Sequence, residues 1–543
     1  MFSSSEAETY DVEPGFADQA RLNQCLLTAA LKPRYDFVVC GAGSSGSVIA
    51  RSLAENPEAT VLLVEAGGDD DIADVVVPHR WMANLGSERS WNFVTTPNPR
   101  LNYRSVPWAM GKLLGGGSSI NVMAWARGHR DDWDLFAEEG RDKSWSYESV
   151  LDVYRNIEDW HGAPDPAYRG IGGPVFVQPA PDPNPVAPAA IDAARSVGIP
   201  TYPHPNGQLM EAGAGAAIGD VRMKNGKRES VFRSYTFPLM DRGNLTVLTH
   251  ALVARVLFEG TTAVGVELVH CGTTQQIAAT TEVVLSLGAI NTPKVLLQSG
   301  VGDENELRHF NIPTVRHLPG VGRNLQDHVA FDCVWEYRKA ESPRNNMAEA
   351  VVFGQTTTGL NHPDVFAWQV EVPNSTRANI SQFGLPDAGW TLLGAVAHPK
   401  SRGRVRLSGP NPTAPPVIDA NLLSHPDDMN AAIACVQWCR EIGNAAPLHP
   451  YVKREVMPGN LKGAELSNFV RNAATTFHHQ SGTAKMGHDE MSVVNGKLEV
   501  HEIENLRIAD ASIMPQITIG NTMAPCVVIG ERAAHLLKER HDL

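Results

Sequence analysis

The stretch YDFVVCGAGSSGSVIARSLAENPEATVLLVEAG, from Tyr35 to Gly67, decides the fold of this chain. A short apolar strand runs into a glycine-rich turn, a helical segment follows, and a second apolar strand ends at Glu65. The glycines stand where the backbone must turn tightly and approach a pyrophosphate: Gly41, Gly43 and Gly46. The first N–H groups of the helix favour phosphate, and an acid about 20 residues further on can accept hydrogen bonds from ribose hydroxyls. The pattern therefore predicts a dinucleotide-binding β-α-β unit, and an acid at position 65 leaves FAD and NAD as candidates.

Length and charge narrow the class of protein. A chain of 543 residues exceeds a single core, so two or three domains are expected. The net charge of −14, with no run of lysine or arginine, argues against nucleic acid and anionic membrane surfaces as partners. No segment approaches the roughly 20 apolar residues of a membrane span. The polar N-terminus lacks a signal-peptide pattern, and the 7 scattered cysteines are typical of reduced thiols, so a cytoplasmic location is expected.

The rest of the chain reads as strands and helices in separated blocks. An amphipathic helix is predicted at 18–31, ahead of the first strand. Short apolar runs bounded by turn residues predict strands at 245–248, 263–269, 283–287 and 506–508. Spaced β-type segments at 366–372 and 390–397 predict a separate antiparallel sheet.

With these pieces in place, the chain resembles the glucose-methanol-choline (GMC) family of FAD-dependent oxidoreductases over about residues 34–540. Several motifs carry the likeness in the order of the family: GAGSSGSVIARSLAEN, GKLLGGGSSINVMAWARG, GAINTPKVLLQSGVG, PGVGRNLQDH, HHQSGTAKMG and LRIADASIMPQITIGNTMAPCVVIGERAA. The resemblance implies an α/β fold, with a Rossmann-like FAD-binding domain built from discontinuous segments and an inserted α+β substrate domain that carries an antiparallel sheet. We expect residues 1–33 to form an N-terminal extension. The FAD-binding domain is expected at 34–160, 208–330 and 460–543, and the substrate-binding domain at 161–207 and 331–459.

The resemblance also implies where FAD binds. Residues that match the family's pyrophosphate and adenosine positions are Gly41, Gly43, Ser44, Ser45, Glu65, Ala66 and Val253. Residues that match the segments beside the ring system and the ribityl chain are Leu113, Gly116, Asn121, Val122, Met123, Ala124, Asp510, Ala511, Thr522 and Met523. Some members attach the flavin through a histidine directly before the matching asparagine. Here that position is Ile120, which cannot form the bond, so non-covalent FAD is expected.

Oxidation of an alcohol removes a hydroxyl proton and a hydride, and flavin accepts the hydride. The family's proton acceptor matches His479, and imidazole suits this role because its ordinary pKa of about 6.5 lies near working pH. We expect His479 to bond the substrate oxygen. If the segment is extended, the neighbouring His478 points to the opposite face and is structural.

The second active-site position departs from the family pattern. Counting back from IGERAA places Met523, in GNTMAP, where the family has asparagine or histidine. A thioether is a weak acceptor and no donor, so it cannot hold an alkoxide by hydrogen bonding. Three interpretations stay open: His479 acts alone, a neighbour such as Asn521 or Thr522 takes the place, or Met523 shapes an apolar pocket.

The expected activity is oxidation of the CH–OH group of a small-molecule alcohol to a carbonyl. Molecular oxygen or another electron acceptor would then take the electrons. The alternative is an FAD-containing lyase of the hydroxynitrile lyase type, which transfers no hydride. The presence of His479 argues against the family's light-driven decarboxylase. The alcohol itself, whether a sugar, a choline-like cation, an aryl alcohol or a polyol, is left open by the sequence.

Overall fold

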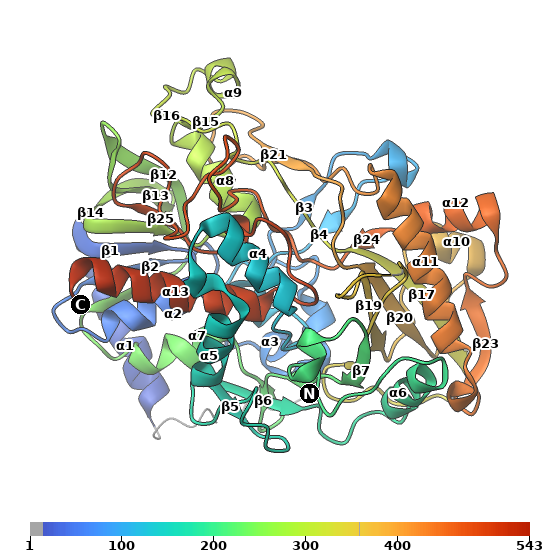
Figure 1. Cartoon of the computed structure of the whole chain (residues 1–543). Helices are drawn as coiled ribbons and strands as arrows, with labels where there is room; N and C mark the ends of the chain where they lie inside the picture. The colour runs from blue at the N-terminus through green and yellow to red at the C-terminus, as the bar shows by residue number, and fades with distance from the viewer. Residues whose placement is uncertain (1–14, 358) are drawn as a thin grey trace.

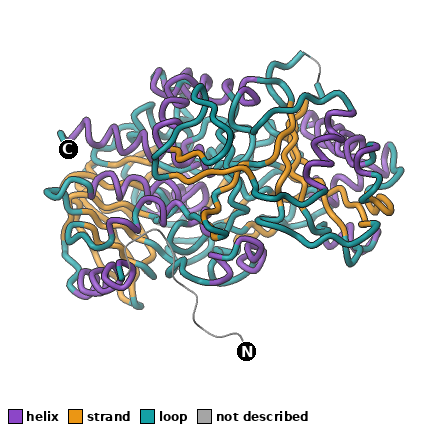
Figure 2. The backbone as a smooth tube through the Cα atoms, turned by 90° about the horizontal axis from the view of Figure 1, so that it is seen from below, coloured by secondary structure: helices purple, strands orange, loops and turns teal. Residues whose placement is uncertain are grey.

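The computed structural model describes residues 15–357 and 359–543, and it contains two large β-sheets that lie side by side (Figures 1 and 2). The first fourteen residues of the expected N-terminal extension lie outside this range. The helices are α1 Phe16–Ala29, α2 Ser44–Ala54, α3 Ala73–Val76, α4 Arg130–Gly140, α5 Tyr147–Ile157, α6 Val186–Ser196, α7 Val231–Tyr235, α8 Gly288–Gln298, α9 Glu304–His309, α10 Arg377–Phe383, α11 Pro426–Gly443, α12 Gly463–Ala473 and α13 Met523–His541. None of the helices in this part of the chain has the length and apolar character needed to cross a membrane.

The first sheet contains the predicted nucleotide unit. Its order is β11-β2-β1-β14-β13-β12, with β25 beside β14. The strands are β1 Arg34–Cys40, β2 Val61–Val64, β11 Leu245–Leu248, β12 Ala251–Glu259, β13 Thr262–His270, β14 Thr273–Leu285 and β25 Leu506–Ile508. The pairs β11–β2, β2–β1, β1–β14 and β14–β25 are parallel, so their carboxyl ends meet at one edge. Each strand that we predicted for this region from its apolar run is present.

Two helices from opposite ends of the chain pack together against this sheet. In Figure 1 the C-terminal α13 runs alongside β1 and β2, next to α2. Gly530 permits the close packing, because a Cβ there would lie 2.9 Å from the Ser45 carbonyl oxygen. The Ser45 hydroxyl also donates to the Cys526 carbonyl over 2.6 Å. The first half of α13 is thereby fixed beside the first glycine turn.

The second sheet is antiparallel, as predicted from the 366–372 and 390–397 segments. Its order is β23-β17-β20-β19-β18-β7, with β24 beside β17. The strands are β7 Gly215–Ile218, β17 Val329–Tyr337, β18 Ala348–Gly354, β19 Val365–Val370, β20 Gly389–Val396, β23 Val452–Met457 and β24 Thr475–Thr476. Helix α11 covers one face, where Gly394 leaves room for the thiols of Cys435 and Cys439.

The two sheets draw on more separate chain segments than the predicted domain boundaries allow for. Strand β7 lies within the expected FAD-binding segment 208–330, and β24 lies within 460–543, yet both pair with strands of the second sheet. The smaller strands are β3 Phe93–Val94 with β4 Pro107–Trp108, β5 Glu158–Trp160 with β6 Val175–Pro179 and β8 Asp220–Val221, β9 Met223–Lys224 with β10 Lys227–Arg228, β15 Val301–Gly302 with β16 Arg316–His317, and β21 Arg404–Arg406 with β22 Val417–Asp419. The architecture is a mixed α/β fold with several sheets.

A buried ion-pair cluster fixes the β5–β6–β8 sheet. The Glu158 carboxylate receives Arg127 Nη2 at 2.6 Å and Arg169 Nε at 2.8 Å. Arg169 Nη1 also lies 2.6 Å from Asp220 Oδ2. These side chains are almost completely buried, so removal of one partner leaves uncompensated charge in a low-dielectric interior.

We therefore expect Glu158→Ala to lower the free energy of unfolding by about 3–5 kcal/mol, measured by urea denaturation. The matched control is Asp192→Ala, which breaks the exposed Arg195–Asp192 pair of 2.6 Å. That change should cost less than about 1 kcal/mol, because water screens exposed pairs. Equal losses in the two variants would show that the cluster does not hold the sheet.

Candidate active site

A cavity of about 1260 Å³ lies between the two sheets and takes walls from both. The first glycine turn and the carboxyl end of β2 line one end of it. The segments 370–378 and 475–480, from the region of the second sheet, line the other. The volume exceeds the roughly 300–1000 Å³ typical of a drug-sized ligand, so a dinucleotide and a substrate can be accommodated together.

The β1–α2 turn forms the nucleotide end of the cavity. Gly41 has φ 99°, and a Cβ there would lie 2.3 Å from the Ser286 carbonyl oxygen. Gly46 packs on the same turn, where a Cβ would approach the Gly41 carbonyl oxygen to 1.9 Å. At Gly43, by contrast, a Cβ would meet nothing within 4 Å. Two of the glycines therefore serve close packing, and Gly43 keeps a space open at the start of α2.

Glu65 closes this end from the tip of β2. Its Oε2 accepts the Ala42 N–H at 3.1 Å and its Oε1 accepts the Gly67 N–H at 2.9 Å. Burial raises the pKa of this carboxyl to about 7, against the opposing effect of these backbone donors. A carboxylate has about four acceptor sites, so two remain for a ligand hydroxyl.

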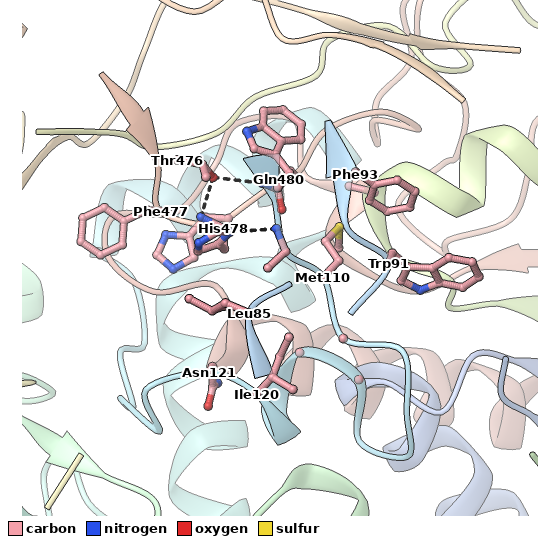
Figure 3. Close-up of a pocket in the computed structure, with 18 of the residues that line it drawn as sticks. Leu85, Trp91, Phe93, Met110, Ile120, Asn121, Thr476, Phe477, His478 and Gln480 are labelled. Carbon is pink, nitrogen blue, oxygen red and sulfur yellow. Dashed lines mark hydrogen bonds between the residues drawn. The ribbon is translucent and has the colours of Figure 1, made fainter. Parts of the chain in front are cut away.

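The second glycine run, 111–119, packs directly on the first. Gly116 has φ 53°, and a Cβ there would lie 2.8 Å from the Gly43 Cα. The Gly115 N–H donates to the Ala42 carbonyl at 2.8 Å. This contact brings Ile120 and Asn121 to the cavity wall, opposite His478 and Gln480 (Figure 3).

These residues fit FAD. The N-terminus of α2 has no side-chain cap, so its first N–H groups are available to a phosphate, and the open space at Gly43 lies beside them. Glu65 supplies an acceptor at the distance along the chain that ribose recognition requires. Within residues 15–357 and 359–543, no group of three or more His, Cys, Asp or Glu side chains is placed to hold a metal ion.

Most of the residues matched to the family line the cavity. They are Gly41, Gly43, Ser44, Ser45, Glu65, Ala66, Gly116, Asn121, Val122, Ala124, Val253, His479, Asp510, Ala511, Thr522 and Met523. Leu113 and Met123 do not line it, because their side chains are buried in small apolar clusters behind the wall. Asp510 is engaged by the protein itself: its Oδ2 accepts the Gly288 N–H at 2.9 Å and the Thr292 hydroxyl at 2.6 Å.

His479 lies among groups that fix its ring and its tautomer. Its Nε2 is 3.3 Å from the Asn521 amide nitrogen, and its Nδ1 is 2.8 Å from His328 Nδ1. Because an amide NH₂ only donates, Nε2 presents its lone pair, and the proton of the neutral ring is on Nδ1, donated to His328. Phe477 stacks on the imidazole with ring centroids 5.2 Å apart.

The imidazole of His479 is neutral at physiological pH. Burial, together with the smaller effect of the neighbouring His478, lowers its pKa to about 3. Its backbone N–H donates to Asp327 Oδ1 at 2.9 Å, and burial raises the pKa of Asp327 to about 7. A neutral ring with a lone pair on Nε2, which the Asn521 amide contacts in this structure, is the form that accepts a proton.

The expected orientation of His478 is wrong, whereas its structural role stays a prediction. The segment is not extended at this point: His478 has φ 63°, in the left-handed region, so the chain turns and both histidines line the cavity. The His478 backbone N–H donates to the Thr476 hydroxyl at 2.7 Å, and its Nδ1 accepts the Ala109 N–H at 3.3 Å (Figure 3). Burial lowers its pKa to about 4.

Asn521, not Met523, stands next to the histidine. The Met523 sulfur instead accepts from Asn121 Nδ2 at 3.2 Å and lies 3.9 Å from Arg222 Nη1. The arrangement corresponds to the second of the three interpretations of GNTMAP, in which a neighbour takes the place of the usual residue.

His328 is a site residue to which the sequence analysis gave no role. It lies in the quoted motif PGVGRNLQDH, directly before β17, and β17 pairs with β24 two residues before His478. That pairing brings His328 and His479 together, and the Phe477 N–H donates to the His328 carbonyl at 3.1 Å. A histidine at the end of that motif, directly before the apolar run 329–331, was the available signal.

Comparison with known proteins agrees with this geometry. Residues 35–330 and 399–530 match the two family models described as GMC oxidoreductase. The chain is 38% identical to "Oxygen-dependent choline dehydrogenase" of Klebsiella pneumoniae (strain 342), over 94% of this chain and 97% of that protein. It is 34% identical to "Alcohol dehydrogenase [acceptor]" of Pseudomonas putida, over 94% and 96%.

Among solved structures, pyridoxine 4-oxidase from Mesorbium loti superposes with a TM-score of 0.89 and 30% identity, covering 94% of this chain and 99% of that one. These relatives are dehydrogenases and oxidases, so the alternative of a hydroxynitrile lyase is not favoured. The chain belongs to the GMC oxidoreductase family and is an FAD-dependent oxidoreductase that acts on CH–OH donors.

Proposed function

We propose that this enzyme oxidises a small-molecule alcohol with His479 as proton acceptor and with FAD held non-covalently. The lone pair on His479 Nε2, at the wall of a cavity that also contains the nucleotide turn, is the observation that carries the proposal. The FAD-binding domain is assigned to 34–160, 208–330 and 460–543, and the substrate-binding domain to 161–207 and 331–459. Strands β7 and β24 are shared across these boundaries.

The FAD contacts are assigned to the cavity residues that match the family. Gly41, Gly43, Ser44 and Ser45 would hold the pyrophosphate, and Glu65 with Ala66 and Val253 the adenosine. The residues assigned to the ring and ribityl chain are Leu113, Gly116, Asn121, Val122, Met123, Ala124, Asp510, Ala511, Thr522 and Met523. Leu113 and Met123 can contribute only through their backbone or through the packing behind the wall.

When bound, FAD supplies the acceptor for the hydride that leaves the carbon. The side chains of the protein accept the hydroxyl proton. His479 Nε2 takes it from the substrate hydroxyl, and His328 accepts the Nδ1–H of the resulting imidazolium. The Asn521 amide, beside Nε2, is placed to donate to the substrate oxygen as negative charge develops there.

The related proteins are named for different substrates, choline and pyridoxine among them, so the alcohol is best sought with a panel. The part of the cavity formed around the second sheet has both apolar and polar side chains, among them Val370, Leu393, Asp332 and Thr391. Molecular oxygen or another acceptor would complete the cycle. The proposal places the enzyme in the cytoplasm, which agrees with the free state of its seven cysteines.

Non-covalent FAD predicts complete release on denaturation. The side chain before Asn121 is Ile120, an aliphatic group that cannot form a bond to the flavin. Acid precipitation of the purified yellow protein should leave all flavin absorbance in the supernatant. Absorbance that stays with the precipitated protein would refute this assignment.

His479→Ala should slow anaerobic bleaching of the flavin by an alcohol substrate by about 10²–10⁴-fold, the usual contribution of positioned acid–base catalysis. Stopped-flow absorbance would measure it. The control is Cys271→Ala at an exposed thiol, which should leave the rate unchanged. If the flavin of His479→Ala bleaches as fast as that of the unmodified enzyme, His479 is not the proton acceptor.

Asn521→Ala and Met523→Leu separate the two candidates for the second active-site position. Loss of the Asn521 amide should slow flavin reduction about tenfold to a hundredfold, because it removes a hydrogen bond to a charged group. Met523→Leu keeps an apolar side chain of similar volume and should change the same rate much less. A larger effect of Met523→Leu than of Asn521→Ala would instead support Met523 as the residue at the second active-site position.

A further inference from the structure

Behind Met523 lies a buried cation, Arg222, between β8 and β9. The residue has no exposed surface. Its Nη2 donates to the Ser234 hydroxyl at 2.6 Å, its Nη1 lies 3.9 Å from the Met523 sulfur, and its Nε has no partner. Burial lowers its pKa to about 10, so the guanidinium is still charged at neutral pH.

The charge of Arg222 is poorly compensated compared with other buried arginines of this chain. Arg127 and Arg169 each contact a carboxylate within 3 Å. Arg222 is linked to the Glu229 carboxylate through the Ser234 hydroxyl, which lies 3.4 Å from Glu229 Oε2, and its guanidinium carbon lies 5.8 Å from the Trp125 ring centroid. An isolated buried cation is costly, and an anionic group nearby would offset that cost.

One side chain separates this charge from the cavity. Met523 lines the cavity and contacts Arg222 on its other side. The thioether carries no charge and excludes water, so the field of the guanidinium reaches the cavity with little screening. A second guanidinium, Arg228, donates to Asn121 Oδ1 at 2.8 Å and so orients the amide that contacts the same sulfur.

Resting on the proposed placement of the flavin ring beside Met523, we propose that Arg222 electrostatically stabilises negative charge on the bound flavin. The alcohol gives a proton to His479 and a hydride, with two electrons, to the ring, which therefore gains one negative charge. Arg222 acts through the Met523 position, where the family usually has a hydrogen-bonding residue. Arg222 is fully buried behind Met523, so it acts on the ring through its electric field and not by direct contact.

Sulfite binding to the FAD-loaded enzyme measures this field without any alcohol. The sulfur lone pair forms a bond to N5 of the ring, no group leaves, and the ring takes on the negative charge. Arg222→Met should raise the sulfite dissociation constant at least about tenfold. The same loss should lower the two-electron reduction potential, since a tenfold change in the equilibrium constant corresponds to about 30 mV.

Matched variants make the result specific. Arg222→Gln removes the charge but keeps a donor for Ser234, and should behave like Arg222→Met, whereas Arg222→Lys keeps the charge and should stay close to the unmodified enzyme. The control is Arg255→Met, at a partly exposed pair with Glu267. Unchanged sulfite affinity and potential in a neutral variant that retains FAD would overturn the proposal.

If neither neutral variant retains flavin, Glu229→Gln provides the test. Burial raises the pKa of Glu229, so the comparison is made at the alkaline end of the range in which the enzyme is stable, where the carboxyl is ionised. The substitution then removes the negative charge that opposes Arg222, so sulfite should bind more tightly, and no change would overturn the inference. Failure of the proposed function looks different: the unmodified protein would then bind no FAD, or its flavin would not bleach with any alcohol.

Discussion

The site depends on the contact between two glycine loops. Gly116 approaches Gly43 so closely that a single added carbon would lie 2.8 Å from the opposite Cα. This approach joins the nucleotide turn to the 111–124 run, and through that run to Asn121. The C-terminal helix joins the same point, because Ser45 bonds Cys526 and Gly530 packs on Ser45. Three segments far apart in sequence thus meet around one turn.

A second constraint is the pairing of β17 with β24. It places His328 opposite His479 and leaves Asn521 to contact the other ring nitrogen. The ring is also held between Phe477 and His328. Burial keeps both histidines of the 478–479 pair neutral, so neither ring carries a positive charge before reaction. Two buried guanidinium groups, those of Arg222 and Arg228, contact Met523 and Asn121.

The sequence was sufficient for whatever depends on local pattern. Strand periodicity predicted both sheets, and the motif carrying His479 predicted a histidine that does line the cavity. Features that depend on backbone angles or on long-range pairing could not be read in the same way. The left-handed backbone at His478 turns its side chain toward the cavity, and the residue type does not predict that backbone angle. Asn521 and Met523 are two residues apart, and only the packing of α13 decides which one reaches His479.

The interleaving of the chain has a consequence for how such an enzyme diversifies. Strands β7 and β24 pass into the second sheet from segments that otherwise build the nucleotide half, so neither half is a continuous cassette. Exchange of residues 331–459 as one block by recombination would leave β7 and β24 of the second sheet behind. Point changes on the cavity face of the antiparallel sheet, by contrast, leave these strand pairings intact.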